Sequence, residues 1–190
     1  MARNDGCFFL YAKLKFKTTK GVIIIRTTTK NMVLASLFAG LMAICAWICV
    51  PVSDIAFTMQ TFSVFLVLLV LGGKWGTVSI GIYLLLGFIG MPVFSGFRSG
   101  PGVLLGVTGG YLWGFLSTGL CFWCAEKWGK IPGLILGLAA CYVCGSIWFL
   151  VYSGGGLVFV LMRCVVPYVI PDLVKLWLAA HLAKRLKKYT

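Results

Sequence analysis

Long runs without a charged side chain constrain this sequence more than any other feature. Charged residues gather at a few positions, and the apolar stretches between them approach the ~17–25 residues that a helix needs to cross a bilayer. The chain has a mean hydropathy of +1.01 and 11% charged residues, whereas a soluble domain carries about 25%. The sequence therefore predicts an all-α integral membrane protein.

Six membrane-spanning helices are expected. The first five are predicted at residues 31–50, 57–73, 76–93, 103–125 and 131–152. The sixth is placed at 171–187, because proline suits the first turn of a helix and Asp172 suits the positive end of the helix dipole. Residues 157–169 are expected to form a separate connecting segment, since a single helix from 157 to 183 would rise about 40 Å.

Basic residues predict the orientation of these helices. Both termini are expected in the cytoplasm, because that arrangement places fourteen of the 17 lysines and arginines there, in agreement with the positive-inside rule. These fourteen are the seven basic residues of 1–30 together with Lys74, Lys127, Lys130, Lys184, Arg185, Lys187 and Lys188. The connections at 51–58, 90–102 and 153–156 then face outward.

Residues 1–30 are expected to form a basic extension ahead of a membrane domain at 31–190. The net charge of +13 would indicate nucleic acid binding in a soluble protein. Here the basic residues cluster at the chain ends, so contact with anionic lipid headgroups explains them and no nucleic acid is expected. The apolar patches of the extension are too short for a signal peptide.

A glycine-rich polar segment, 92–115, lies between two apolar runs and holds Arg98, the only charged residue between Lys74 and Glu126. Glycine lets a backbone approach a ligand closely, and arginine can hold a carboxylate with two parallel hydrogen bonds. The alternative is an extramembrane loop whose arginine lies near lipid phosphates.

Asp172 and Lys175 are three residues apart, so they share a face of the last helix. Charges within a membrane are costly and usually have a partner or line a cavity. Either the two neutralise each other as a buried pair, or they present one acceptor and one donor to a polar ligand, with Arg98 opposite. Such a ligand would be small, with a carboxylate at one end and an amide-like group at the other.

Other residues are candidates by position, namely Gln60, Thr61, Tyr83, Thr108, Gly109, Gly110 and Tyr111. Each of them alone could equally serve helix packing or lie at the membrane interface. Ala35 and Ala39 form a strip of small residues in the first span. Such a strip serves either internal packing or docking onto another membrane subunit.

Two Cys-x-x-Cys pairs, at 121–124 and 141–144, have a spacing found in zinc ribbons. Both pairs lie inside apolar runs, where cysteine behaves as a small hydrophobe, so neither a metal nor a cofactor is expected. The sequence contains no phosphate-binding loop and no hydrolase triad. If this protein concentrates a solute, the energy must come from an ion gradient or from a partner.

Four runs of the sequence form a set of spaced motifs: PVSDIAFTMQTF, GIYLLLGFIGMPVFSGFRSGPG, GVTGGYLWGF and VVPYVIPDLVKLWLAAHLAKRL. This set resembles the BioY family, the biotin-specific substrate-binding (S) components of energy-coupling factor (ECF) transporters, and covers about residues 50–188. The sequence departs from the family in two places. Residues 53–56 stand where a proline-rich outer loop is common, and Val107 replaces a frequent proline.

The resemblance implies a six-helix S component in the cytoplasmic membrane that captures biotin from outside and has no catalytic residue. Its partners would be a membrane coupling subunit and two cytoplasmic ATPases, with Ala35 and Ala39 similar to the strip that docks onto the coupling subunit. The resemblance assigns Arg98, Asp172 and Lys175 to the biotin pocket. It also implies pocket positions at Gln60, Tyr83, Phe94, Thr108, Gly109, Gly110 and Tyr111.

Three alternatives stay open from the sequence. The chain could be an S component for another carboxylated vitamin or for a biotin precursor. A small intramembrane enzyme that uses Cys121 or Cys144 would belong to a different class. A packing or regulatory subunit would bind no ligand at all.

Overall fold

The computed structural model describes residues 28–50, 57–186 and 188. The chain divides into two units, Met1–Leu34 and Ala35–Thr190. The described part of the first unit is the opening of the helix Thr28–Trp47. Most of the predicted basic extension at 1–30 and most of the predicted outer connection at 51–58 lie outside the described residues.

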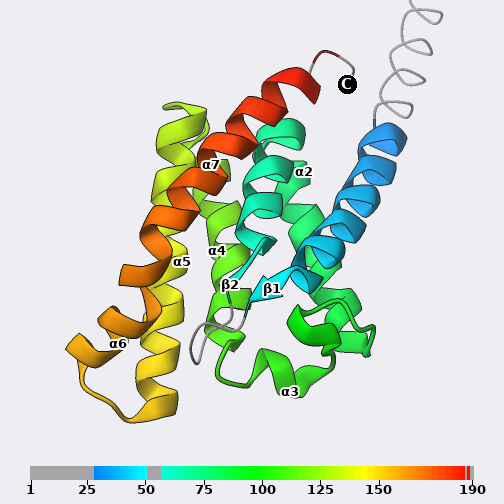
Figure 1. Cartoon of the computed structure of the whole chain (residues 1–190). Helices are drawn as coiled ribbons and strands as arrows, with labels where there is room; N and C mark the ends of the chain where they lie inside the picture. Colours follow the sequence, from blue (N-terminus) through cyan, green and yellow to red (C-terminus); the bar gives the residue numbers. More distant parts are fainter. Residues whose placement is uncertain (1–27, 51–56, 187, 189–190) are drawn as a thin grey trace, which may run out of the picture. The chain divides into compact units, whose positions relative to one another are not determined.

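Helices make up most of the second unit (Figure 1). After the helix Thr28–Trp47 come β1 (Cys49–Val50), β2 (Phe57–Thr58), α2 (Gln60–Ile89), the 3-10 turn η1 (Ser95–Phe97), α3 (Pro101–Leu104), α4 (Gly109–Ala125), α5 (Lys130–Ser153), α6 (Leu157–Cys164) and α7 (Val166–Leu186). β1 and β2 are antiparallel, with Val50 opposite Phe57. The helical class is as predicted, and the short β pairing is a feature that the sequence did not predict.

Four stretches of the described chain are long and apolar enough to cross a membrane. They are Thr28–Trp47, Gln60–Ile89, Lys130–Ser153 and the combined α6–α7 stretch Leu157–Leu186. α4 has 17 residues and would rise about 26 Å, close to the ~30 Å thickness of the hydrocarbon core. The chain is therefore a multi-pass membrane protein.

α2 is a helical hairpin rather than one straight helix. Gly72 has φ 80° and ψ 175°, a conformation that residues with a side chain rarely adopt. Beyond this kink the chain folds back, so that a Cβ on Gly76 would lie 2.7 Å from Leu68 Cδ2. Glu126 Oε2 accepts a hydrogen bond from the Gly73 N–H at 2.9 Å, which satisfies a donor that the start of the second limb leaves open. The kink falls where the sequence separated its second and third predicted spans.

The last helix begins earlier than predicted. α7 starts at Val166, so Pro171 lies inside it and Asp172 is not in its first turn. The prediction of a start at 171 was wrong. A proline in a helix interior removes one hydrogen bond, but a membrane helix can tolerate that loss when neighbouring groups re-satisfy the backbone. The separate connecting segment exists as α6, which ends at Cys164 and is followed by a break at Val165.

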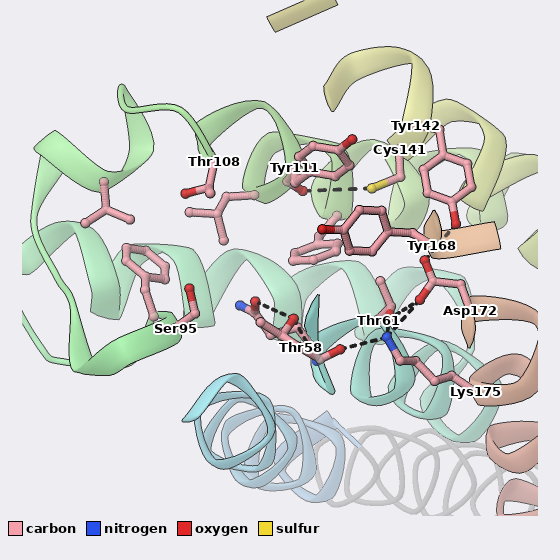
Figure 2. Close-up of a pocket in the computed structure, with 15 residues that line it drawn as sticks. Thr58, Thr61, Ser95, Thr108, Tyr111, Cys141, Tyr142, Tyr168, Asp172 and Lys175 are labelled. Atoms are coloured by element: carbon pink, nitrogen blue, oxygen red, sulfur yellow. Dashed lines mark hydrogen bonds and ion pairs between the residues drawn. The ribbon is translucent and has the colours of Figure 1, made fainter. Parts of the chain in front are cut away.

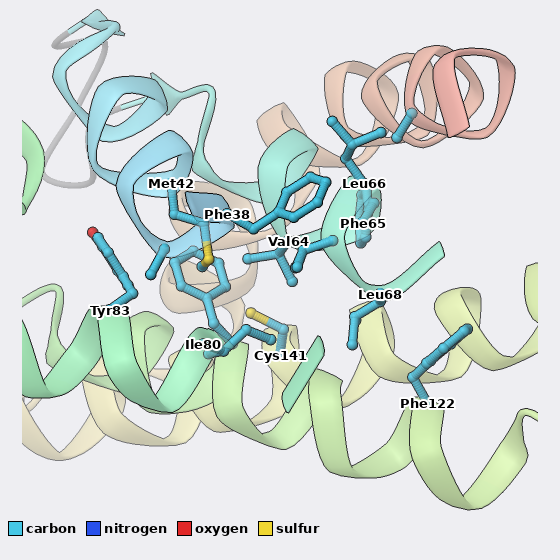
Figure 3. Close-up of a cluster of buried hydrophobic side chains, with 14 of the residues drawn as sticks. Phe38, Met42, Val64, Phe65, Leu66, Leu68, Ile80, Tyr83, Phe122 and Cys141 are labelled. Carbon is cyan, nitrogen blue, oxygen red and sulfur yellow. The ribbon is translucent and has the colours of Figure 1, made fainter. Parts of the chain in front are cut away.

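The buried core joins both limbs of α2 to the helix Thr28–Trp47 (Figure 3). Phe38 and Met42 of that helix pack with Val64 and Phe65 of the first limb and Ile80 of the second. α4 and α5 run antiparallel in close contact, since Gly114 lies against Cys141 while Gly137 lies against Thr118. In Figure 1, the α4–α5 connection and the C-terminal end of α7 lie at one end of this unit, and α3 and α6 lie at the other.

The contact between α4 and α5 can be tested with glycine substitutions. A Cβ on Gly114 would lie 2.8 Å from Cys141 Sγ and 3.1 Å from Cys141 Cα, so Gly114→Ala should force the helices apart and cost about 1–3 kcal/mol. Gly81→Ala is the matched control, because nothing lies within 4 Å of its Cβ position and alanine favours a helix by up to ~1 kcal/mol. Thermal unfolding in one detergent should lower the midpoint for Gly114→Ala and not for Gly81→Ala. A Gly114→Ala protein as stable as the parent would contradict this packing.

Candidate functional site

A cavity of about 60 Å³ is enclosed by α2, α4, α5, α7 and the glycine-rich segment before α4 (Figure 2). Its lining combines aromatic, hydroxyl and charged side chains. The lining residues are Thr58, Gln60, Thr61, Phe94, Ser95, Val103, Thr108, Tyr111, Leu112, Phe115, Cys141, Tyr142, Tyr168, Asp172 and Lys175.

Asp172 lies at one end of the cavity and accepts three hydrogen bonds. Its Oδ1 accepts from Thr61 Oγ1 at 2.8 Å and from Lys175 Nζ at 2.9 Å. Its Oδ2 accepts from the Tyr142 hydroxyl at 2.7 Å. Asp172 is only 3% exposed, so these bonds replace the water that would solvate a free carboxylate.

Lys175 is held as closely as its partner. Besides the bond to Asp172, its Nζ donates to the Thr58 carbonyl at 2.7 Å and to Thr61 Oγ1 at 3.0 Å. The same ammonium lies 3.9 Å from the centroid of the Phe57 ring, a cation–π contact. An ammonium has three N–H donors, and all three are used within the protein.

Asp172 and Lys175 therefore form a buried ion pair, which was one of the two arrangements expected from the sequence. The same pair also lines a cavity. Buried ion pairs are tolerated when further hydrogen bonds satisfy the remaining atoms. Here the additional partners come from Thr58 and Thr61 on one side and Tyr142 on the other. The arrangement fixes one carboxylate and one ammonium at a single end of the cavity.

The two ends of the cavity differ in chemistry. Figure 2 shows Ser95 and Thr108 at the end opposite Asp172 and Lys175. Much of the lining is aromatic, from Tyr111, Tyr142, Tyr168, Phe94 and Phe115. Such a cavity suits an elongated ligand with a polar group at each end and an apolar middle.

Gln60 and Phe94 line the cavity, whereas Tyr83 lies behind them. The Gln60 Nε2 donates to the Tyr83 hydroxyl at 2.5 Å, and that hydroxyl donates to the Val93 carbonyl at 3.1 Å. The rings of Tyr83 and Phe94 meet edge to face with centroids 5.6 Å apart. Tyr83 is fully buried, so its observed contacts position two lining residues.

The glycine-rich segment is anchored to the rest of the second unit. The Trp47 ring N–H donates to the Pro92 carbonyl at 2.9 Å, and Trp47 stacks on Phe97 with centroids 4.9 Å apart. The Gly100 N–H donates to the Gly87 carbonyl at 2.8 Å. These contacts hold Phe94 over the cavity.

Arg98 is exposed and does not line the cavity in this structure. Its Nε donates to the Ser95 carbonyl at 3.1 Å, so it lies one short turn from a lining residue. Gly109 and Gly110 also lie outside the lining, and they serve packing. A Cβ on Gly109 would meet the Leu104 carbonyl, and one on Gly110 would meet the Trp148 side chain.

Ala35 and Ala39 are 0% exposed. The Ala35 carbonyl accepts a hydrogen bond from Ser79 Oγ at 2.7 Å, and Ala39 belongs to the main core. The structure therefore uses both alanines in internal packing, which is one of the two roles expected of them. Docking of a partner through this strip stays a prediction.

Sequence reasoning missed Tyr142 and Tyr168. Tyr168 lies four residues before Asp172 and seven before Lys175, so the three share one helix face. That spacing could have identified Tyr168. Tyr142 lies on α5, far from Asp172 in the sequence, and no local pattern joins them. No cluster of three or more potential metal ligands occurs among the residues that the structure describes.

The fold and the site define a multi-pass membrane protein with an enclosed, charged cavity between its helices. The chain belongs to the BioY family, whose model matches residues 16–190. The biotin transporter BioY of Thermotoga maritima is 37% identical over 177 residues, covering 84% of this chain and 96% of that protein. The probable biotin transporter BioY of Pyrococcus horikoshii is 38% identical over 164 residues, covering 85% and 98%.

The same fold occurs in a solved structure. The crystal structure of the S-component for biotin from an ECF-type ABC transporter matches with a TM-score of 0.78 and 24% identity, covering 86% of this chain and 93% of the other. The family that the sequence motifs predicted is therefore confirmed, and so is a helical fold like that of this S-component.

The buried ion pair makes a sharp prediction about stability. Lys175→Met leaves Asp172 as an uncompensated buried charge and should destabilise the protein by about 3–5 kcal/mol. The double variant Asp172→Asn/Lys175→Met removes both charges and should recover much of that loss, because neutral residues of similar volume can replace a buried pair. Thermal unfolding in detergent measures both.

Lys184→Met is the matched control, since Lys184 is an exposed lysine on the same helix and its loss should change little. A double variant less stable than Lys175→Met alone would show that the two charges do not depend on each other.

Proposed function

We propose that this chain captures biotin as the S component of an ECF-type transporter in the cytoplasmic membrane. The relatives with the highest coverage are named as biotin transporters, which also disfavours a cysteine-dependent enzyme. The observation that carries the proposal is the Asp172–Lys175 pair at the end of an aromatic cavity. Its chemistry matches the polar head of biotin.

Biotin has a ureido head with two N–H donors and one carbonyl, an apolar ring and chain, and a carboxylate tail. An aspartate can accept from the N–H groups, and a lysine can donate to the carbonyl. We place the ureido head at Asp172 and Lys175, and the apolar middle against Tyr111 and Tyr168. Gln60, Phe94 and Thr108, which line the cavity, would contact the ligand directly, with Tyr83 supporting two of them.

The carboxylate tail is assigned to the other end, near Ser95. Arg98 follows three residues later, and its Nε already contacts the Ser95 carbonyl. A guanidinium there can hold the carboxylate with charge-assisted hydrogen bonds when the segment closes over a ligand. Gly109 and Gly110 would act indirectly, through their close packing against Leu104 and Trp148.

The proposed assembly has six spans with both termini in the cytoplasm. The six spans would be the helix Thr28–Trp47, the two limbs of α2, α4, α5 and α7. The chain has no phosphate-binding loop, so transport would need two cytoplasmic ATPases and a membrane coupling subunit. That subunit would dock on the helix Thr28–Trp47, in which Ala35 and Ala39 allow close packing.

Substitutions at the two ends of the cavity should weaken the binding of the two ends of biotin independently. Asp172→Asn should weaken the binding of biotin and of biotin amide alike, because both ligands keep the ureido head. Arg98→Ala should weaken biotin by about 10–100-fold, as expected for one or two lost bonds to a charged group. The amide has no carboxylate, so Arg98→Ala should leave its affinity nearly unchanged. Titration calorimetry on the purified parent protein and on both variants measures the affinity for each ligand.

Lys184→Ala serves as the control, because it removes an exposed charge from α7 without touching the cavity. The proposal fails if the parent protein does not bind biotin, or if Asp172→Asn binds it as tightly as the parent does. If Arg98→Ala weakens both ligands equally, biotin binding stands but the placement of its tail is wrong.

The orientation can be tested with reporter fusions. Green fluorescent protein fused at the C-terminus should fluoresce, because that end is expected in the cytoplasm with the basic residues Lys184 and Arg185. Alkaline phosphatase fused after Gly155, in the α5–α6 connection, should be active because it would be exported. Phosphatase activity at the C-terminus instead would reverse the proposed topology.

A further inference from the structure

The cavity is too small for a ligand of the proposed size, so part of its wall must move. Its volume is about 60 Å³, whereas pockets that hold small molecules usually measure about 300–1,000 Å³. Most of the lining comes from α2, α4, α5 and α7, and closely packed helices deform little. Phe94 and Ser95 come instead from residues 91–99, a short segment that we call the flap. The flap is the part of the wall that can move at the lowest cost.

The flap lies between two glycines that can act as hinges. Gly90, which ends α2, has φ 112°, and Gly100, which precedes α3, has φ 87°. Nothing lies within 4 Å of the Cβ position of either glycine, so close packing does not require them. Glycine adopts this backbone conformation and its alternatives with similar ease, so the chain can turn at both ends of the flap.

One residue inside the flap has a strained backbone. Phe97 has φ 56° and is the only non-glycine residue of the described chain with a positive φ. Such a conformation costs free energy and persists only where other contacts compensate for it. The Phe97 ring stacks on Trp47 with centroids 4.9 Å apart, and the Trp47 ring N–H donates to the Pro92 carbonyl at 2.9 Å. Trp47 therefore holds the flap at two points.

The contacts on the two sides of the flap differ in exposure. On the buried side, the Tyr83 hydroxyl donates to the Val93 carbonyl at 3.1 Å, and the Tyr83 ring meets that of Phe94. On the other side, Trp47 is 39% exposed and Phe97 63%. Local opening starts where contacts are few and exposed to solvent, so the flap should separate first from Trp47.

We propose that Trp47 is a positioning residue that holds the flap closed and thereby controls access to the ligand cavity. When its contacts with Pro92 and Phe97 break, the flap turns about Gly90 and Gly100 and the cavity opens. The contacts form again when the flap closes over a ligand. The identity of that ligand as biotin rests on the proposed function, whereas opening of the flap can be measured without any ligand.

Cys141 can report the opening of the cavity. It lines the cavity and is 2% exposed (Figure 2), so iodoacetamide reaches its thiol only when the wall opens. Purified protein without biotin is treated with iodoacetamide, and peptide mass spectrometry follows the alkylation of each cysteine separately. Trp47→Ala should raise the alkylation rate of Cys141 by about 5–100-fold, the factor expected for the loss of one ring stack and one hydrogen bond. Cys164 is 0% exposed and lies outside the lining, so its rate should not change.

Two further variants test whether the effect comes from the Trp47–Phe97 stack. Phe97→Ala should also raise the alkylation rate of Cys141. The double variant Trp47→Ala/Phe97→Ala should react no faster than Trp47→Ala alone, because both substitutions remove the same ring stack. Trp177→Ala is the matched control, since it removes an exposed ring stack with His181 on α7, away from the flap. It should leave the rate at the parental value.

Binding kinetics distinguish control of access from a structural defect in the cavity. Trp47→Ala should raise the association and dissociation rates of radiolabelled biotin by similar factors. The Kd should stay nearly unchanged, because the Trp47 contacts stabilise the closed flap both with and without ligand. Rapid filtration measures both rates, and an association rate equal to that of the parent would contradict the proposal.

Two alkylation results would also overturn the proposal. One is a Cys141 rate in Trp47→Ala that equals the parental rate. The other is an equal increase at Cys141 and Cys164, which would mean that Trp47 supports the whole fold and not the flap. A parent protein that does not bind biotin would overturn the proposed function alone, because the alkylation experiment contains no ligand.

Discussion

The burial of two opposite charges inside a membrane protein is the constraint on which the rest of this structure depends. A charged side chain at the bilayer centre costs at least ~2.5–3.5 kcal/mol on insertion scales. Asp172 and Lys175 are tolerated because each charged group has several partners, which include the Thr61 and Tyr142 hydroxyls and the Thr58 carbonyl. These partners belong to different elements, so α7, α5, the start of α2 and β2 must meet at one point. The cavity lies where they meet.

Two irregular parts of the backbone lie beside this charged pair. Within a helix, carbonyls are bonded to the N–H four residues on, so an interior carbonyl is a poor acceptor for an ammonium. Thr58 precedes α2 in an extended strand, and its carbonyl is available to Lys175. Pro171 has a related effect on α7, since a proline lacks an N–H and leaves one carbonyl of the preceding turn unbonded. Both of these departures from regular helix therefore occur next to the charged pair.

The sequence predicted those features that depend on residue type and helical spacing. Charge-free runs identified a helical membrane protein, and the three-residue spacing of Asp172 and Lys175 placed both on one face. The start of α7 was misplaced because proline was read as a helix start, although tertiary contacts allow it inside. The role of Tyr142 could not be predicted from the sequence, because its bond to Asp172 joins α5 to α7 and depends on how these helices pack. Arg98 was chosen as a candidate because it is the only charged residue of a long apolar stretch. That property does not determine how far its side chain lies from the cavity.

Asp172 and Lys175 differ in the hydrogen-bonding capacity that they leave for a ligand. Lys175 uses all three of its N–H donors within the protein, so a ligand carbonyl can bind it only by displacing an internal acceptor. The carboxylate of Asp172 has about four acceptor sites, and three are used, with a single bond at Oδ2. A ligand N–H can therefore bind Asp172 without breaking any bond. Since an exchanged hydrogen bond contributes less than an added one, Asp172 is the residue at which the proposed ligand would gain net affinity. Lys175 would act mainly by holding that carboxylate in place through its bond to Oδ1.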